Sequence, residues 1–266
     1  MTTANKAAEI AAYRAHPGIN ATTIKAGRTS MLHARHAYAR GEIDPTPAME
    51  LGSAVHAMLS GLQDVIEYAG TRRGKDWEAF EAANPGALIL PTASFSAAAA
   101  MAASAKSSML QVEHPDAQRE RPLYWKRNGY ECKALPDFDA PGVLLDIKTT
   151  SSIEPRKIER ASYDSGWHVQ LGWYALGLAN DGKRPDDVFI LAIESKPPFD
   201  AVLYRMDDDA IERGMKEACK IADQFAACLQ SGKFPGIANG ETLALALPTW
   251  VDENTTVDFT DTNTDD

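Results

Sequence analysis

Two aspartates and a lysine lie close together in the middle of the chain. Asp137 follows a proline, Asp146 stands nine residues later, and Lys148 is two residues beyond Asp146. Two neighbouring carboxylates repel each other unless a cation lies between them, and Mg²⁺ prefers a few carboxylates plus water molecules. A lysine beside such an ion can help to form hydroxide and can neutralise charge that develops on a phosphoryl group. These three side chains are therefore the minimal parts for hydrolysing a phosphodiester bond.

An apolar run leads directly into the second aspartate. Val143, Leu144 and Leu145 precede Asp146, which indicates a buried strand that carries charge toward its end. Alternation along a strand puts Asp146 and Lys148 on the same face. An Asp-x-Lys sequence alone would more often indicate an exposed charged strand, but burying charges is costly unless they have a function. The apolar run therefore favours a functional site.

Elements upstream must position these residues. Apolar residues recur at intervals of three and four over 48–62, which predicts an amphipathic helix that carries His56. Short strands are predicted at 123–125, 130–132 and 143–147, with Asn128-Gly129 as a hairpin turn and Pro141-Gly142 before the third strand. If the second and third strands are adjacent and antiparallel, Asp137 at the end of the second lies beside Asp146. Helices are also predicted over 1–17, 20–40 and 95–110, and residues 63–95 have a mixed pattern.

Downstream, the pattern predicts a helix over 164–180, strands at 188–194 and 201–206, and a long helix from Asp207 to about residue 230. Gln170 and Tyr174 stand four residues apart in the first of these helices and so share one face. Without further evidence that face would simply pack on the sheet. The order of elements predicts an α/β core with a mixed sheet flanked by helices.

Composition sets wider limits. No stretch of about 18 apolar residues exists to span a bilayer, and the first residues do not resemble a signal peptide. Three cysteines without CxxC spacing argue against a disulfide framework or a zinc finger, which favours the cytoplasm. The net charge of −10 argues against tight, non-specific coating of DNA. Residues 252–266 hold six of the acidic residues and no Lys or Arg, so the rest of the chain carries only −4.

These patterns divide the chain into three parts. Residues 1–47 are predicted to form an N-terminal helical extension, and 48–251 the catalytic domain. Residues 252–266 form an acidic tail that we expect to be disordered, because its composition offers little apolar surface to bury.

Five blocks of sequence, in a fixed order, resemble a known family. They read GSAVH at 52–56, QRERPLYW at 118–125, CKALPD at 132–137, LDIKTT at 145–150 and HVQLGWY at 168–174. Together they resemble the signature of RecE-type exonucleases (exonuclease VIII), in the RecB-like branch of the PD-(D/E)XK nuclease superfamily. The resemblance extends over about residues 20–250. It implies a restriction-endonuclease-like core, an α/β fold with a mixed central sheet flanked by helices.

The resemblance also implies roles for individual residues. His56, Asp137 and Asp146 would bind Mg²⁺, for which Mn²⁺ would substitute, together with the backbone carbonyl of Ile147. Lys148 would position or activate the attacking water.

Further roles follow from the same resemblance. Gln170 and Tyr174 would orient the catalytic lysine or contact the scissile phosphate, and Glu120 is a candidate auxiliary acid. Residues near the end of the third strand and just after it are candidate DNA contacts, namely Thr149, Thr150, Arg156, Lys157 and Arg160.

The implied activity is Mg²⁺-dependent, 5′-to-3′ exonuclease digestion of linear double-stranded DNA from its ends. It would leave 3′ single strands for phage-type recombination in a bacterial host cell. A RecT-type annealing protein is the implied partner, and a ring-shaped homo-oligomer the implied assembly.

Two alternatives stay open. The first is a RecB-like or CRISPR-associated nuclease of other polarity or of endonuclease type. An iron–sulfur version is disfavoured, because such a cluster needs four cysteines. The second is a catalytically silent DNA-binding protein of the same fold.

Overall fold

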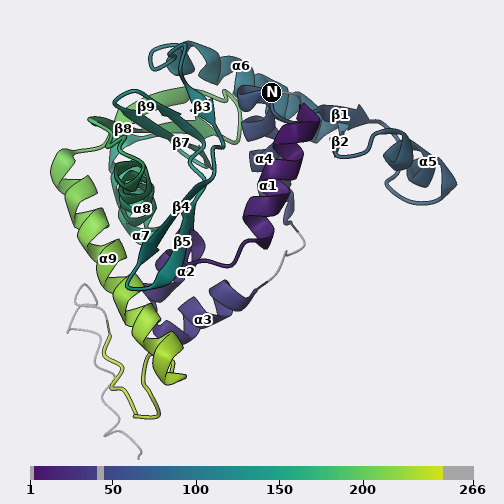
Figure 1. The fold of residues 1–266 in the computed structure, drawn as a ribbon. Helices are drawn as coiled ribbons and strands as arrows, with labels where there is room; N and C mark the ends of the chain where they lie inside the picture. Colours follow the sequence, from purple (N-terminus) through teal and green to yellow (C-terminus); the bar gives the residue numbers. More distant parts are fainter. Residues whose placement is uncertain (1–2, 41–44, 248–266) are drawn as a thin grey trace, which may run out of the picture.

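The computed structural model describes residues 3–40 and 45–247, so the predicted acidic tail lies outside the described residues. A five-stranded mixed sheet forms its centre (Figure 1), in the order β3-β6-β7-β8-β9. The only parallel pair in this sheet is β7 with β8. The strands are β3 (Gln118–Arg119), β6 (Phe138–Ala140), β7 (Val143–Thr150), β8 (Asp187–Glu194) and β9 (Ala201–Arg205). The predicted α/β class and the mixed sheet are therefore confirmed.

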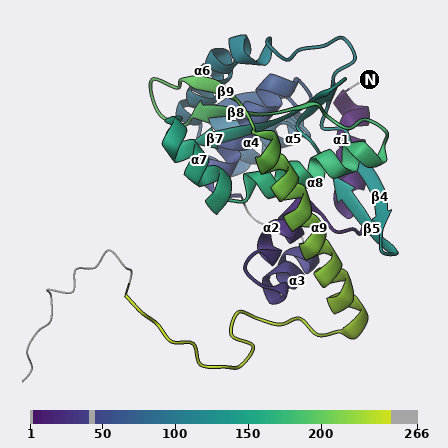
Figure 2. The same ribbon diagram turned by 90° about the vertical axis from the view of Figure 1, so that its left-hand side faces the viewer.

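Helices cover both faces of the sheet (Figures 1 and 2). On one face, α8 (Trp167–Asn180) and α9 (Asp208–Ser231) pack over Leu144 and Ile190. On the other face, α4 (Pro47–Ser60) and α6 (Thr92–Met109) pack over Leu145 and Ile147. Successive residues of β7 thus enter opposite cores, as strand alternation requires. Asp146 and Lys148 follow Leu144 in register and face the α8 layer.

Helices α2 (Ala21–Gly27) and α3 (Met31–Ala39) belong to the α8 side of the molecule, whereas α1 (Thr3–Ala15) lies beside α4 (Figure 1). Asn20 and Ser30 cap α2 and α3, each accepting a hydrogen bond from a backbone N–H of the first turn. Ile24 and Ala34 are fully buried in the same core as α8. The division at residue 47 remains a prediction, but α2 and α3 share a core with the residues that follow it.

The hairpin predicted around Asn128-Gly129 is confirmed. Strands β4 (Leu123–Arg127) and β5 (Tyr130–Ala134) pair antiparallel, and both turn residues have positive φ, 49° and 82°. Asn and Gly suit such a turn because they adopt this conformation at low cost. The hairpin forms a small sheet of its own and packs on α8, where the rings of Trp125 and Trp173 lie 4.8 Å apart.

The helix predicted over 164–180 is confirmed as α8, which begins just after Gly166, a residue whose φ of 66° does not fit a helix. Other parts of the predicted pattern were wrong or incomplete. Helix α7 (Pro155–Asp164) was not predicted, and the helix predicted over 20–40 is two helices, α2 and α3, because Ser30 starts a new helix. Residues 63–95 contain a parallel strand pair, β1 (Val65–Tyr68) and β2 (Leu88–Pro91), joined by α5 (Lys75–Ala83). Among the described helices, none is long and apolar enough to span a membrane.

Candidate active site

The site forms where β6 and β7 separate. Their pairing runs from Ala140↔Val143 only to Phe138↔Leu145, so the rest of β7 has no strand partner on that side. Asp137, immediately before β6, places its carboxylate there, and its Oδ2 accepts a hydrogen bond from the Ile147 N–H at 2.7 Å. The prediction that Asp137 ends the second strand was wrong, because that strand, β5, belongs to the other sheet and β6 was not predicted.

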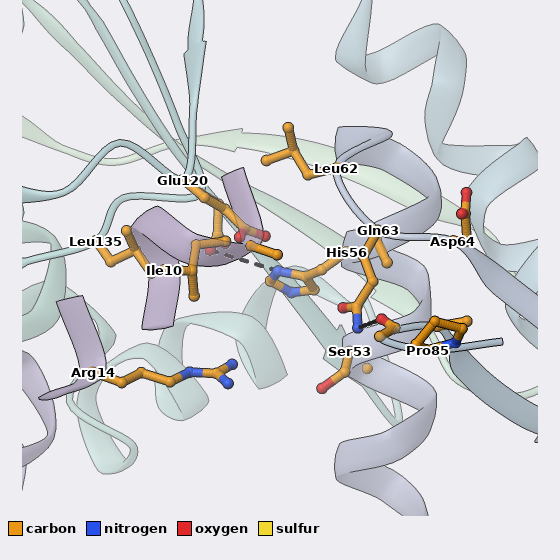
Figure 3. A pocket seen from close by; sticks show the side chains of 16 residues that line it. Ile10, Arg14, Ser53, His56, Leu62, Gln63, Asp64, Pro85, Glu120 and Leu135 are labelled. Carbon is orange, nitrogen blue, oxygen red and sulfur yellow. Dashed lines mark hydrogen bonds and ion pairs between the residues drawn. The ribbon is translucent and has the colours of Figure 1, made fainter. Parts of the chain in front are cut away.

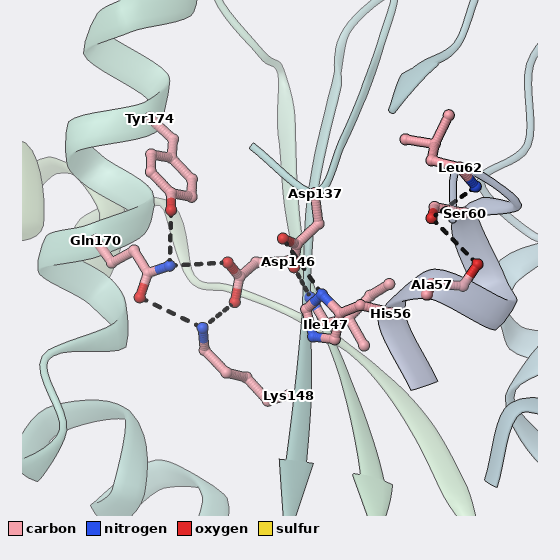
Figure 4. A network of polar contacts seen from close by, with 10 residues as sticks. All are labelled: His56, Ala57, Ser60, Leu62, Asp137, Asp146, Ile147, Lys148, Gln170 and Tyr174. Carbon is pink, nitrogen blue, oxygen red and sulfur yellow. Dashed lines mark hydrogen bonds and ion pairs between the residues drawn. The ribbon is translucent and has the colours of Figure 1, made fainter. Parts of the chain in front are cut away.

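Asp146 is the most deeply buried of the site residues, with 1% of its side chain exposed. Its Oδ2 forms an ion pair with the Lys148 ammonium, and its Oδ1 accepts a hydrogen bond from Gln170 Nε2 at 3.0 Å. The same nitrogen donates to Tyr174 Oη at 2.9 Å. Figure 4 shows Gln170 and Tyr174 on α8 facing Asp146, with Asp137 and His56 on its other side. The structure therefore brings these predicted site residues together from four separate segments.

The orientation of the Gln170 amide is set by charge. Its Oε1 accepts hydrogen bonds from two ammonium groups, Lys148 at 3.3 Å and Lys25 at 2.9 Å. Since ammonium groups only donate and a carboxylate only accepts, Oε1 must face the lysines and Nε2 must face Asp146. Gln170 thus links the acidic and basic halves of the site. Lys25, on α2, was not among the predicted site residues.

His56 enters the site from α4, on the opposite side of the sheet edge. Its Nδ1 lies 3.5 Å from Asp137 Oδ1. Helix α4 approaches β7 closely at Gly52, where a Cβ atom would stand 3.2 Å from Thr149 Oγ1. Burial alone would lower the pKa of His56, but the Asp137 carboxylate raises it to about 9. In this arrangement His56 is an imidazolium paired with Asp137.

The two carboxylates differ in acidity. Burial opposes ionisation of both, but His56 and the Ile147 N–H hold the pKa of Asp137 below its usual value. The pKa of Asp146 is raised, because burial and the neighbouring Asp137 charge outweigh the attraction of Lys148. Burial together with Asp146 also raises the pKa of Tyr174, so Tyr174 stays neutral.

The donor set can be tested for its fit to a metal ion. Within residues 3–40 and 45–247, no three His, Cys, Asp or Glu side chains are arranged to surround one ion. Mg²⁺, however, commonly takes only one or two carboxylates and keeps its waters. Asp146 Oδ2 is fully buried and already faces a cation, the Lys148 ammonium, and Asp137 Oδ1 likewise faces His56. Asp137 and Asp146 therefore fit a hard divalent cation, and His56 would have to leave Asp137 and lose its proton to join them.

A pocket of about 550 Å³ opens on the His56 side of the site (Figure 3). Side chains from α1, including Ile10 and Arg14, face α4 across it, and Asp137 and Glu120 line it as well. Glu120 has a φ of 47°, a conformation that non-glycine residues seldom adopt. Burial and the Asp137 charge raise the pKa of Glu120. This candidate auxiliary acid therefore lies beside the site but faces the pocket.

The predicted DNA contacts lie at the end of β7 and on α7, the next helix along the chain. Thr149 and Thr150 end β7 and are half-buried, whereas Arg156, Lys157 and Arg160 are exposed on α7. Lys157 pairs with Glu154 and Arg160 with Asp164, both as exposed neighbours on the helix. Such surface ion pairs are weak, so these cations can exchange their partners for phosphate.

Comparison with known proteins supports the fold. The model of a family described as a PDDEXK-like domain of unknown function (DUF3799) matches residues 22–242. A structure from Eubacterium rectale named "Putative exonuclease" has a TM-score of 0.62 at 16% identity, over 93% of this chain and 96% of that one. A phage-related exonuclease from Haemophilus somnus 129PT, with a TM-score of 0.37 at 12% identity over 82% of this chain and 96% of that one, is too distant to compare. No curated protein matches this sequence.

Proposed function

Because the chain belongs to the PDDEXK-like family DUF3799 and has its α/β fold, we propose that it is a Mg²⁺-dependent nuclease that hydrolyses phosphodiester bonds in DNA. One observation carries the proposal. Asp137, Asp146 and Lys148 meet at the open edge of β7, in a buried network where Gln170 touches both Asp146 and Lys148. A network made only for stability would gain little from burying two carboxylates next to each other.

Each residue has a distinct part in the proposed reaction. Asp137 and Asp146 would hold the cation, with the Ile147 carbonyl and His56 in its neutral form as further ligands. When bound, the cation supplies a Lewis acid that polarises the phosphoryl group and makes water easier to deprotonate. Lys148 holds the attacking water and offsets the charge that develops on the phosphate. Gln170 fixes Lys148 relative to Asp146, and Tyr174 fixes Gln170.

We propose further that the substrate is the end of linear double-stranded DNA and that digestion runs 5′ to 3′. The support is the resemblance of the sequence blocks to RecE-type exonucleases. The same resemblance supports a RecT-type annealing protein as partner and a ring-shaped homo-oligomer. The pocket beside His56 offers room for a nucleotide that leaves the site, which suits removal of nucleotides from an end.

The chemistry is tested with Asp146→Asn and Lys148→Met. The purified chain should digest linear duplex DNA with Mg²⁺ and not with EDTA, and each variant should lose at least about 100-fold in rate, as when one electrostatic group of an active site is removed. Lys216→Met is the matched control, since Lys216 is 78% exposed on α9. Wild-type rates in Asp146→Asn would show that the site is assigned wrongly.

The mode of digestion is tested on three substrates. Linear duplex labelled at its 5′ or its 3′ end reports polarity, and a covalently closed circle reports endonuclease activity. An exonuclease leaves the circle intact and, if it runs 5′ to 3′, releases the 5′ label first. Cleavage of the circle would instead favour the endonuclease alternative.

A further inference from the structure

Two lysines from distant parts of the chain share one acceptor in the site. Lys25 on α2 and Lys148 on β7 both donate to Gln170 Oε1, at 2.9 and 3.3 Å. Like charges this close repel each other, more strongly in a partly buried site than in water. Two adjacent ammonium groups on a single neutral oxygen are therefore a costly arrangement unless an anion binds between them.

The fold holds Lys25 in this position firmly. Asn20 caps the helix that carries it, and the adjacent Ile24 is fully buried. The stem of Lys25 packs beside Gly166 at the N-terminus of α8, where a Cβ atom would lie 3.4 Å from Lys25 Cγ. Lys25 is thus built into the site and does not reach it by chance as a long surface side chain.

Gln170 contacts two ammonium groups, Lys25 and Lys148, but only one carboxylate, Asp146. Asp146 forms an ion pair with Lys148. In the described part of the chain, no carboxylate oxygen forms an ion pair with Lys25. Burial and the charge of Lys148 lower the pKa of Lys25 to about 8, because together they outweigh the attraction of the Asp146 carboxylate, which Lys148 shares. Both lysines remain partly exposed to solvent, so an anion can reach them.

We propose that Lys25 is a substrate-binding residue, which together with Lys148 holds one phosphate group of the DNA strand in addition to their shared contact with Gln170 Oε1. This inference rests on the proposed nuclease function, since that function supplies the phosphate. It assigns a substrate contact to α2, which lies within the predicted N-terminal extension. A phosphate oxygen can accept hydrogen bonds from both ammonium groups and supplies the negative charge that the protein does not.

The test measures DNA binding without catalysis. A fluorescent single-stranded oligonucleotide is titrated with protein in EDTA at several salt concentrations, for wild type, Lys25→Met, Lys25→Arg and the surface control Lys216→Met. Loss of a charged hydrogen bond should weaken binding about tenfold in Lys25→Met. For Lys25→Met, the slope of the logarithm of the binding constant against the logarithm of the salt concentration should decrease in magnitude by about 0.7. This is the value for one phosphate contact on a single strand. Lys25→Arg should keep the wild-type slope, because it keeps the charge.

The salt slope separates substrate contact from a structural role, since general loosening of the site would weaken binding without removing one counter-ion. If Lys25→Met unfolds, Lys25→Gln replaces it, because its amide can still reach Gln170 but carries no charge. Wild-type affinity and slope in a folded, uncharged variant would overturn the Lys25 inference and leave the nuclease proposal intact. Failure of the wild-type chain to bind the oligonucleotide, with no metal-dependent cleavage, would overturn both.

Discussion

Replacing Gln170 with methionine tests how the network holds the site together. Methionine has nearly the same length but neither donates nor accepts as an amide does, so all four contacts of Gln170 are lost at once. Lys25 and Lys148 can turn toward solvent, because both are partly exposed. Asp146 Oδ1 and Tyr174 Oη cannot, because only 1% of the Asp146 residue and 8% of Tyr174 are exposed.

The expected loss of stability follows from these two groups. A buried polar group left without a partner costs about 1–3 kcal/mol, so Gln170→Met should lower the free energy of unfolding by about 2–6 kcal/mol. Tyr174→Phe removes only one hydrogen bond and leaves Gln170 bound to Asp146, so it should cost about 1 kcal/mol. The rate of DNA cleavage by Gln170→Met should fall about 100-fold, as when a catalytic group is displaced by about 1 Å.

Urea unfolding followed by circular dichroism gives the stability, and digestion of linear duplex with Mg²⁺ gives the rate. Gln224→Met on the exposed side of α9 is the matched control, because it makes the same chemical change where no network exists. A Gln170→Met protein as stable as Gln224→Met would refute the argument that Gln170 supplies the partners of Asp146 and Tyr174. A stable variant with the wild-type cleavage rate would also remove Gln170 from the proposed mechanism.

Two further predictions concern stability. In EDTA, the His56–Asp137 pair should stabilise the folded chain by up to about 3 kcal/mol between about pH 5 and pH 6.5. The raised pKa of His56 means that this contribution is lost as pH rises to about 9, and the lowered pKa of Asp137 means that it is also lost in acid, when Asp137 is protonated. Thermal unfolding against pH should show the loss above pH 6.5, and an equal slope in His56→Gln would contradict it. Gly214→Ala should lower the free energy of unfolding by about 1–3 kcal/mol or more through overpacking, because the new Cβ would lie 2.0 Å from His168 O. A melting temperature equal to that of the wild type would contradict this.

Local patterns were sufficient for much of the fold. The helix that carries His56, the Asn128-Gly129 hairpin and the buried strand that carries Asp146 all appear where the sequence predicts them. These elements can be predicted because hydrophobic periodicity and turn residues depend only on residues close together in the sequence. Asp146 and Lys148 could be placed on one face of a strand for the same reason.

Local patterns failed where tertiary packing decides. Strand β6 has three residues and no periodicity of its own, and it exists because it pairs with β7. Helix α7 is different, because Pro155 in its first turn and Gly166 after its end mark its bounds in the sequence, so local pattern could have predicted it.

The sequence by itself determined which residues could do chemistry, since Asp137, Asp146, Lys148, Gln170 and His56 were all identified from residue types and a family resemblance. Only the tertiary structure decided how they meet. The early end of the β6–β7 pairing opens the edge where Asp137 binds the Ile147 N–H. The packing of α2 and α8 in one core brings Lys25 to Gln170 across 145 residues of chain, a contact for which the sequence holds no local signal. Such contacts depend on how whole helices pack against the sheet, and no short stretch of sequence encodes that packing.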